Sequence, residues 1–260
     1  MTEAIDLAAF TRYIALGDSM SIDLYPALDA GEIDVAVALE RSTAAGRVAA
    51  LGAASLLYKN ADDRWPEEAG NDLVSANPSI VLHNLASDGA TIGEVFGEQL
   101  PQLEDTDEPV LITLTIGGND LLSAFGNRPK RALLERIERD VAEAYDFLVD
   151  HVRGRFANGL LIANTIYDPS DRTAKIPGVY DELGALPLDI LDRMNDHIRA
   201  LAVGTPRVVL ADVYAHFLGH GVTVAENERW YWSRSLIEPN AAGANEIRRL
   251  WLETLRRGDL

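Results

Sequence analysis

Short apolar runs, each followed by small polar residues, recur along the chain. They span residues 13–16, 80–85, 110–116, 160–166 and 208–210. Near-continuous apolar runs of this length are typical of parallel strands that are covered by helices on both faces. The pattern therefore predicts a parallel sheet whose strands end in polar turns.

Helical spacing separates these runs. Apolar residues follow steps of three and four from Leu134 to Val152, and again from Ile247 to Leu255, where Asn240 is a suitable N-cap. Residues 25–77 form a longer excursion, in which we expect an alanine-rich helix over 48–57. The alternation of strands and helices predicts a doubly wound three-layer α/β/α sandwich. Because no repeat or low-complexity tract interrupts the pattern, we expect one domain over residues 1–260.

Composition excludes several function classes. A net charge of −18 without a Lys/Arg block disfavours nucleic acid binding. The absence of cysteine excludes disulfides, thiolate zinc sites and a cysteine nucleophile. No metal-type His/Asp spacing is present, so we expect neither metal nor cofactor. The N-terminus lacks a signal-peptide pattern, and no apolar run reaches the roughly 20 residues that span a bilayer. A cytoplasmic protein without membrane contact is the expectation.

Three polar residues come directly after predicted strands: Ser19, Gly89 and Asn119. Ligands of open α/β sheets bind beyond the carboxyl ends of the strands, so these residues should share one edge. Ser19 offers a hydroxyl and an N–H, and Gly89 offers an N–H that a substrate can approach closely. The Asn119 amide is a neutral donor that suits a developing oxyanion. Each residue, taken alone, is equally typical of an ordinary turn or helix cap.

Together, the segments 15–19, 84–91, 116–120 and 239–243 resemble the motifs of the SGNH hydrolases, also called GDSL lipases and esterases. Gly-Asp-Ser alone is a weak signal, whereas Gly-Asp-Ser followed by Gly-Gly-Asn-Asp at this separation is specific. The resemblance implies a flavodoxin-like sandwich of about five parallel strands. It also implies hydrolysis of a carboxylic ester through an acyl-enzyme on Ser19. The Ser19 N–H, the Gly89 N–H and the Asn119 side chain would form the oxyanion hole.

The last motif departs from the family pattern. The family places its catalytic histidine directly before Pro-Asn and an aspartate three residues earlier, whereas this chain has Glu238 and Ser235 at those positions. An ordinary glutamate has a pKa of roughly 4.3. Because Glu238 precedes the last helix, the helix dipole should lower its pKa further. Glu238 is therefore expected to be a poor base by itself.

A histidine elsewhere could replace the missing base. His220 lies between two glycines, after the last predicted strand. We hypothesise that His220 is the general base and that Glu238 orients it, since a triad depends on geometry and not on chain order. His216, Glu238 alone and the absence of any base are the alternatives.

The expected substrate is a small-molecule ester, either of a small acyl group or of a carbohydrate. Acyl transfer to a bound alcohol, and ligand binding by a non-catalytic descendant of the family, are the competing functions.

Several residues near the motifs have expected structural roles. Asp18 and Asp120 should brace loops, residues 230–232 favour core packing over pocket lining, and residues 165–187 form a candidate lid.

Overall fold

The computed structural model of the protein describes residues 5–33, 49–126, 130–178 and 185–258. Its centre is a five-stranded sheet in the order β2-β1-β3-β4-β5, and every pairing is parallel. The strands are β1 (Arg12–Gly17), β2 (Val81–Asn84), β3 (Val110–Thr115), β4 (Leu160–Asn164) and β5 (Val208–Ala211). Each coincides with a predicted apolar run. The order places β1 between β2 and β3, so the polar turns after these three strands are neighbours.

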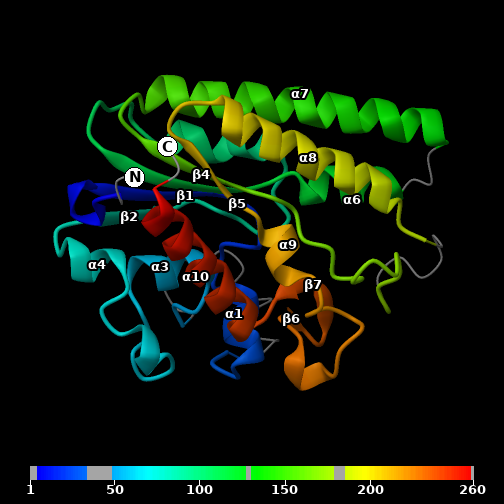
Figure 1. The fold of residues 1–260 in the computed structure, drawn as a ribbon, viewed down its shortest axis with the longest axis horizontal. Coiled ribbons are helices and arrows are strands. Elements are labelled where there is room, and N and C mark those ends of the chain that lie inside the picture. The colour runs from blue at the N-terminus through cyan, green and yellow to red at the C-terminus, as the bar shows by residue number, and fades with distance from the viewer. Residues whose placement is uncertain (1–4, 34–48, 127–129, 179–184, 259–260) are drawn as a thin grey trace.

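Helices cover both faces of the sheet (Figure 1). One face carries α6 (Gly118–Gly126), α7 (Arg131–Arg155) and α8 (Leu188–Gly204). The other carries α1 (Leu24–Asp29), α3 (Ala53–Tyr58), α4 (Leu73–Ala76) and α10 (Ala241–Arg257). Shorter elements are α5 (Ile92–Glu94), a π-turn (Val95–Gln99), α9 (Val213–Phe217), the hairpin β6 (Tyr231–Trp232) and β7 (Ser235–Pro239), and 3-10 turns at Leu7–Ala9, Pro66–Glu68, Leu100–Gln102 and Glu226–Glu228. The predicted three-layer sandwich is confirmed.

The two layers of core follow the alternation of side chains along the strands. In β1, Ile14 and Leu16 pack on the α7/α8 side, whereas Tyr13 and Ala15 pack on the α3/α10 side. Because successive strand residues point to opposite faces, both sets must be apolar when both faces are covered. All six residues of β3 are buried for the same reason.

The predicted helix termini are confirmed in part. Asn240 caps α10, since its side chain accepts a hydrogen bond from the Gly243 N–H (2.8 Å). The alanine-rich helix is shorter than expected, because α3 begins only at Ala53, while Val48 lies outside the described residues. In α10, the fully buried Trp251 donates to Asn164 Oδ1 (2.6 Å) and thereby ties the helix to the end of β4.

Candidate active site

A sharp turn after β1 presents Ser19. Gly17 has φ +123°, and a β-carbon there would lie 1.9 Å from the Thr115 carbonyl oxygen, so only glycine fits. The Asp18 N–H donates to the same carbonyl (2.8 Å). These contacts join the turn to the end of β3 and hold Ser19 at the carboxyl edge of the sheet.

The two other predicted oxyanion residues lie on the neighbouring turns. Gly89 has φ +72° in the turn after β2, and Asn119 lies in the first turn of α6 after β3. The Asn119 side chain donates to the Ala90 carbonyl (3.0 Å), which joins the two turns. A carboxamide has two N–H groups, so one remains for a substrate. Within the described residues, the backbone N–H groups of Ser19 and Gly89 have no hydrogen-bond acceptor.

Three polar side chains, one of them outside the motifs, brace these turns. Gln99 accepts from the Gly17 N–H and donates to the Gly17 carbonyl, both at 2.8 Å. Asp120 accepts from the Ile92 N–H (3.3 Å), and Asp18 accepts from the Met20 N–H (3.1 Å). The bracing role predicted for Asp18 and Asp120 is confirmed. Gln99 was not anticipated, because it belongs to no motif and no local pattern distinguishes it.

Glu238 on β7 lies beside Ser19. The Ser19 side chain interacts with the Glu238 carboxylate and lowers its pKa, but burial outweighs this effect and raises the pKa from 4.5 to about 7. The negative charge of Asp88 contributes in the same direction. The expectation of a lowered pKa for Glu238 is therefore wrong, because desolvation of the 8% exposed side chain outweighs the helix dipole. A carboxylate with this pKa is a competent base near neutral pH.

Asp18 is a second buried carboxyl group next to the nucleophile. Burial raises its pKa to about 8, the Met20 N–H lowers it, and the charge of Glu238 raises it again. Both carboxyl groups therefore have raised pKa values, and Glu238 is the one that interacts with Ser19.

The structure does not bring His220 or His216 to Ser19. The His220 ring stacks on Trp230 with 3.5 Å between ring centroids and 3° between ring planes. The His216 ring nitrogen contacts the Glu246 carboxylate (3.0 Å). Neither histidine lines the pocket that contains Ser19. The Ser19–His220–Glu238 arrangement is not formed, because Trp230 holds the His220 ring outside the pocket.

Ser19, Asn119 and Glu238 line one pocket, which encloses about 730 Å³ of space that is partly open to solvent. The rest of its lining is mainly apolar and comes from α6, α8, β7 and the segments before α8. The apolar residues are Met20, Leu121, Leu122, Phe125, Ile166, Ile176, Leu186, Leu188, Leu191 and Ile237. Sequence reasoning missed most of them, because they are scattered over several elements and each is typical of ordinary core.

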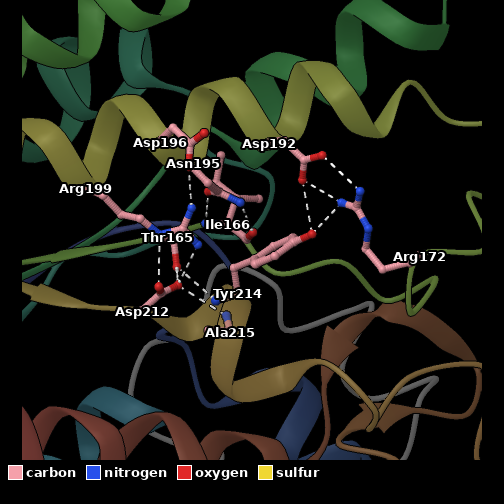
Figure 2. A network of polar contacts seen from close by, with 10 residues as sticks. All are labelled: Thr165, Ile166, Arg172, Asp192, Asn195, Asp196, Arg199, Asp212, Tyr214 and Ala215. Carbon is pink, nitrogen blue, oxygen red and sulfur yellow. Dashed lines mark hydrogen bonds and ion pairs between the residues drawn. The ribbon is translucent and has the colours of Figure 1, made fainter.

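One wall of the pocket belongs to the predicted lid, of which residues 179–184 lie outside the described part. Arg172 and Ala174 have φ values of 70° and 60°, which side-chain-bearing residues rarely adopt. Arg172 forms an ion pair with Asp192 on α8 (2.5 Å) and a hydrogen bond with Tyr214 (Figure 2). Asp171 accepts from the N–H groups of the loop at 219–223. These contacts hold the strained loop in place.

The start of the same wall is fixed to α8 by a second group of contacts (Figure 2). Ile166, which lines the pocket, exchanges two hydrogen bonds of 2.8 Å with the buried Asn195 side chain. Asp212 accepts from Thr165 Oγ1 (2.9 Å) and from Arg199 Nε (2.9 Å). The wall therefore takes its position from α8 and from the start of α9.

Two further expectations concern residues near the site. Tyr231 is buried in the core and Trp230 packs against it, so the core-packing interpretation is confirmed for these two residues. Trp232 is half-buried and belongs to neither core cluster, and it does not line the pocket. Within the described ranges, no three His, Cys, Asp or Glu side chains gather in a way that could hold a metal ion. In the same ranges, no helix has the length and apolar character needed to cross a membrane.

Solved structures with the same fold are lipases and esterases. An extracellular lipase from Streptomyces rimosus is 19% identical, with 94% of this chain and 99% of that chain covered and a TM-score of 0.56. A putative GDSL-like lipase from Parabacteroides merdae is 13% identical, with 97% and 99% covered and a TM-score of 0.63. An acetylxylan esterase from Geobacillus stearothermophilus is 14% identical, with 96% of both chains covered and a TM-score of 0.58. No curated protein sequence matches the chain.

The model of the GDSL-like lipase/acylhydrolase family matches residues 42–245. The matched range includes Gly89, Asn119 and Glu238, and Ser19 precedes it in the turn after β1. Since the match covers most of the chain and the fold agrees, the chain belongs to the GDSL-like lipase/acylhydrolase family.

Proposed function

We propose that the protein hydrolyses carboxylic esters, with Ser19 as the nucleophile and Glu238 as the general base. The observation that carries the proposal is the contact between the Ser19 hydroxyl and the buried Glu238 carboxylate inside the pocket that Asn119 also lines. A nucleophile within hydrogen-bond reach of a base whose pKa lies near the working pH is the arrangement that acyl transfer requires.

The reaction proceeds in two halves. Ser19 Oγ attacks the carbonyl carbon while its proton passes to Glu238, and the carbonyl oxygen becomes an oxyanion. The N–H groups of Ser19 and Gly89 and the free N–H of Asn119 stabilise this charge. Glu238 then gives the proton to the alcohol oxygen as its bond to the acyl carbon breaks. The alcohol departs, and the acyl-enzyme on Ser19 remains. In the second half, Glu238 takes a proton from water as the water oxygen attacks the acyl carbon. The bond between the acyl carbon and Ser19 Oγ then breaks, the carboxylic acid leaves, and Glu238 returns the proton to Ser19.

The raised pKa of Glu238 is what makes this carboxylate effective. At an ordinary pKa, a glutamate would be almost fully ionised at pH 7 but would bind the serine proton weakly. With a pKa of about 7, roughly half of the molecules carry the ionised base at pH 7, and the carboxylic acid is still a good proton donor in the next step. The family histidine is therefore replaced by a buried group that titrates in a similar range.

The pocket favours an aliphatic acyl group as the acid half of the ester. Its lining includes leucine, isoleucine and phenylalanine side chains. Burial of each additional methylene of the acyl chain against them should make the free energy of binding more favourable by about 0.8 kcal/mol. This argument supports a lipid-like acyl group over a small one. Lipases and an acetylxylan esterase share the fold, which supports ester hydrolysis as the reaction class. The cytoplasmic location stays a prediction.

The test combines active-site labelling with kinetics on nitrophenyl esters of increasing acyl length. A fluorophosphonate probe should label the wild type and not Ser19→Ala. Glu238→Gln should lower kcat by about 10²–10⁴-fold, the range for loss of a general base. His220→Ala is the matched control and should stay within about twofold of the wild type.

Each contrary outcome has a defined meaning. Absence of labelling in the folded wild type would overturn the proposal and favour the non-catalytic, ligand-binding alternative. Equal losses in His220→Ala and Glu238→Gln would restore the displaced-histidine hypothesis. If labelling occurs and added alcohols capture the acyl group much faster than water does, the reaction is acyl transfer.

A further inference from the structure

Two aromatic rings and a carboxylate lie beside the catalytic pair, outside the apolar pocket. Tyr25 of α1 donates its hydroxyl hydrogen bond to Asp88 Oδ2 (2.9 Å) in the turn after β2. Its ring contacts the ring of Trp232 on β6, with centroids 5.6 Å apart and planes tilted by 43°. All three side chains are at least partly exposed, and none lines the apolar pocket. We call Tyr25, Asp88 and Trp232 the aromatic mouth.

The aromatic mouth lies near Glu238, because α1, which carries Tyr25, and β6, which carries Trp232, both contact β7. The charge of Asp88 contributes to the raised pKa of Glu238. Burial raises the pKa of the Tyr25 hydroxyl, and the charges of Glu238 and Asp88 raise it further. Glu238 therefore lies between two sites. It lines the apolar pocket, and its charge acts on Tyr25 of the aromatic mouth. An ester whose acyl chain occupies the pocket would leave its alcohol half on the side of the mouth.

The negative charge at this place lacks a protein counterion. Within the described part of the chain, none of Asp18, Asp88, Asp120 and Glu238 forms an ion pair, although many other carboxylates do. In addition, Glu238 Oε2 is buried and has no hydrogen-bond partner. A buried carboxylate without a hydrogen-bond partner is costly in its charged form, and a positive charge bound nearby would lower that cost.

We propose that the alcohol half of the substrate carries a quaternary ammonium group, which binds against the rings of Tyr25 and Trp232 and next to the Asp88 carboxylate. The inference rests on the proposed ester hydrolysis. Tilted aromatic rings attract a cation through their negative faces, and a trimethylammonium group needs no hydrogen-bond acceptors. The neighbouring carboxylates add Coulomb attraction and disfavour an anionic alcohol such as a phosphate ester.

The test compares two octanoyl esters of the same shape, one of choline and one of 3,3-dimethylbutanol. They differ in charge alone, so the ratio of their kcat/KM values isolates the cation. The wild type should prefer the choline ester by about tenfold or more, as expected for a cation on two rings with a carboxylate nearby. Asp88→Asn and Trp232→Leu should each bring the ratio towards one. Asp140→Asn removes an exposed charge on α7 and is the matched control, which should keep the wild-type ratio.

The outcomes separate this inference from the proposed function. Hydrolysis of both esters at equal kcat/KM would overturn the cation site while ester hydrolysis stands. A choline preference that both variants retain would also overturn it, because the preference would then arise elsewhere. If neither ester is hydrolysed and Ser19 resists labelling, the proposed function fails, and calorimetric titration of Ser19→Ala with choline tests the mouth by itself. Absence of binding there, or binding that Trp232→Leu does not weaken, would overturn the inference.

Discussion

Replacing Glu238 by glutamine should stabilise the folded protein at neutral and alkaline pH. The pKa of Glu238 rises from 4.5 in the unfolded chain to about 7 in the folded protein, so the folded state binds the proton more tightly. Stability therefore falls as pH rises wherever the folded state holds more protons than the unfolded state. For Glu238, the loss begins near pH 4.5, grows up to about pH 7 and is constant above that.

The magnitude follows from the size of the shift. One pKa unit corresponds to 1.36 kcal/mol, so ionisation of Glu238 costs the wild type about 3 kcal/mol at pH 8 relative to pH 4. Glutamine keeps the shape of the side chain and has no charge to desolvate. It also removes the charge that raises the pKa of Asp18, which acts in the same direction. The stability advantage of Glu238→Gln over the wild type should thus grow by about 3 kcal/mol across this range.

Urea unfolding followed by circular dichroism, at several pH values between 4 and 8.5, measures the difference. Glu253→Gln is the matched control, because Glu253 is exposed on α10 and its loss should change the pH dependence by less than about 0.5 kcal/mol. Parallel stability curves for Glu238→Gln and the wild type would refute the reasoning. They would show that ionised Glu238 does not destabilise the folded protein through desolvation, and that burial does not raise its pKa.

Four further predictions address the site and its support. The kcat/KM for a nitrophenyl ester should rise with pH around an apparent pKa near 7, because Glu238 loses its proton there. If the same rise persists in Glu238→Gln, it belongs to the titration of another group. Asn119→Ala should lower kcat by about 10²–10³-fold with little change in KM, and an unchanged kcat would remove Asn119 from the oxyanion hole. Gly17→Ala should lower the free energy of unfolding by at least about 3 kcal/mol, because its β-carbon would collide with the Thr115 carbonyl, and a wild-type urea midpoint would contradict this. Leu191→Trp should fill the pocket and shift the preference towards shorter acyl esters, whereas an unchanged chain-length profile would place the acyl group elsewhere.

The sequence predicted those features that depend on local pattern and on sheet geometry. The central strands β1, β3 and β4 could be located because they are buried on both faces. The turns that carry Ser19, Gly89 and Asn119 had to share an edge because the strands are parallel. The cap at Asn240 was also predictable, since its signal is contained in a few adjacent residues.

Features set by long-range packing could not be predicted in this way. The raised pKa of Glu238 depends on the burial of its side chain in the folded protein, whereas the sequence shows only that a helix follows. The position of His220 depends on its stacking partner Trp230, and nothing in the loop around His220 indicates that contact. The pairing of Gln99 with Gly17 joins residues 82 positions apart.

The wall of the pocket and the bond-cleaving groups are attached to different parts of the molecule. Ser19 is held by the sheet through Gly17, where even one added carbon collides with the backbone. The exposed part of the wall is held by the ion pair of Arg172 with Asp192, and pairs of this kind contribute little to stability. Substitutions in this exposed part therefore carry a low risk of unfolding the protein, whereas Ile166 and its partner Asn195 are buried. Over evolutionary time, the range of accepted acids can drift within a lineage while the chemistry that cleaves them stays the same.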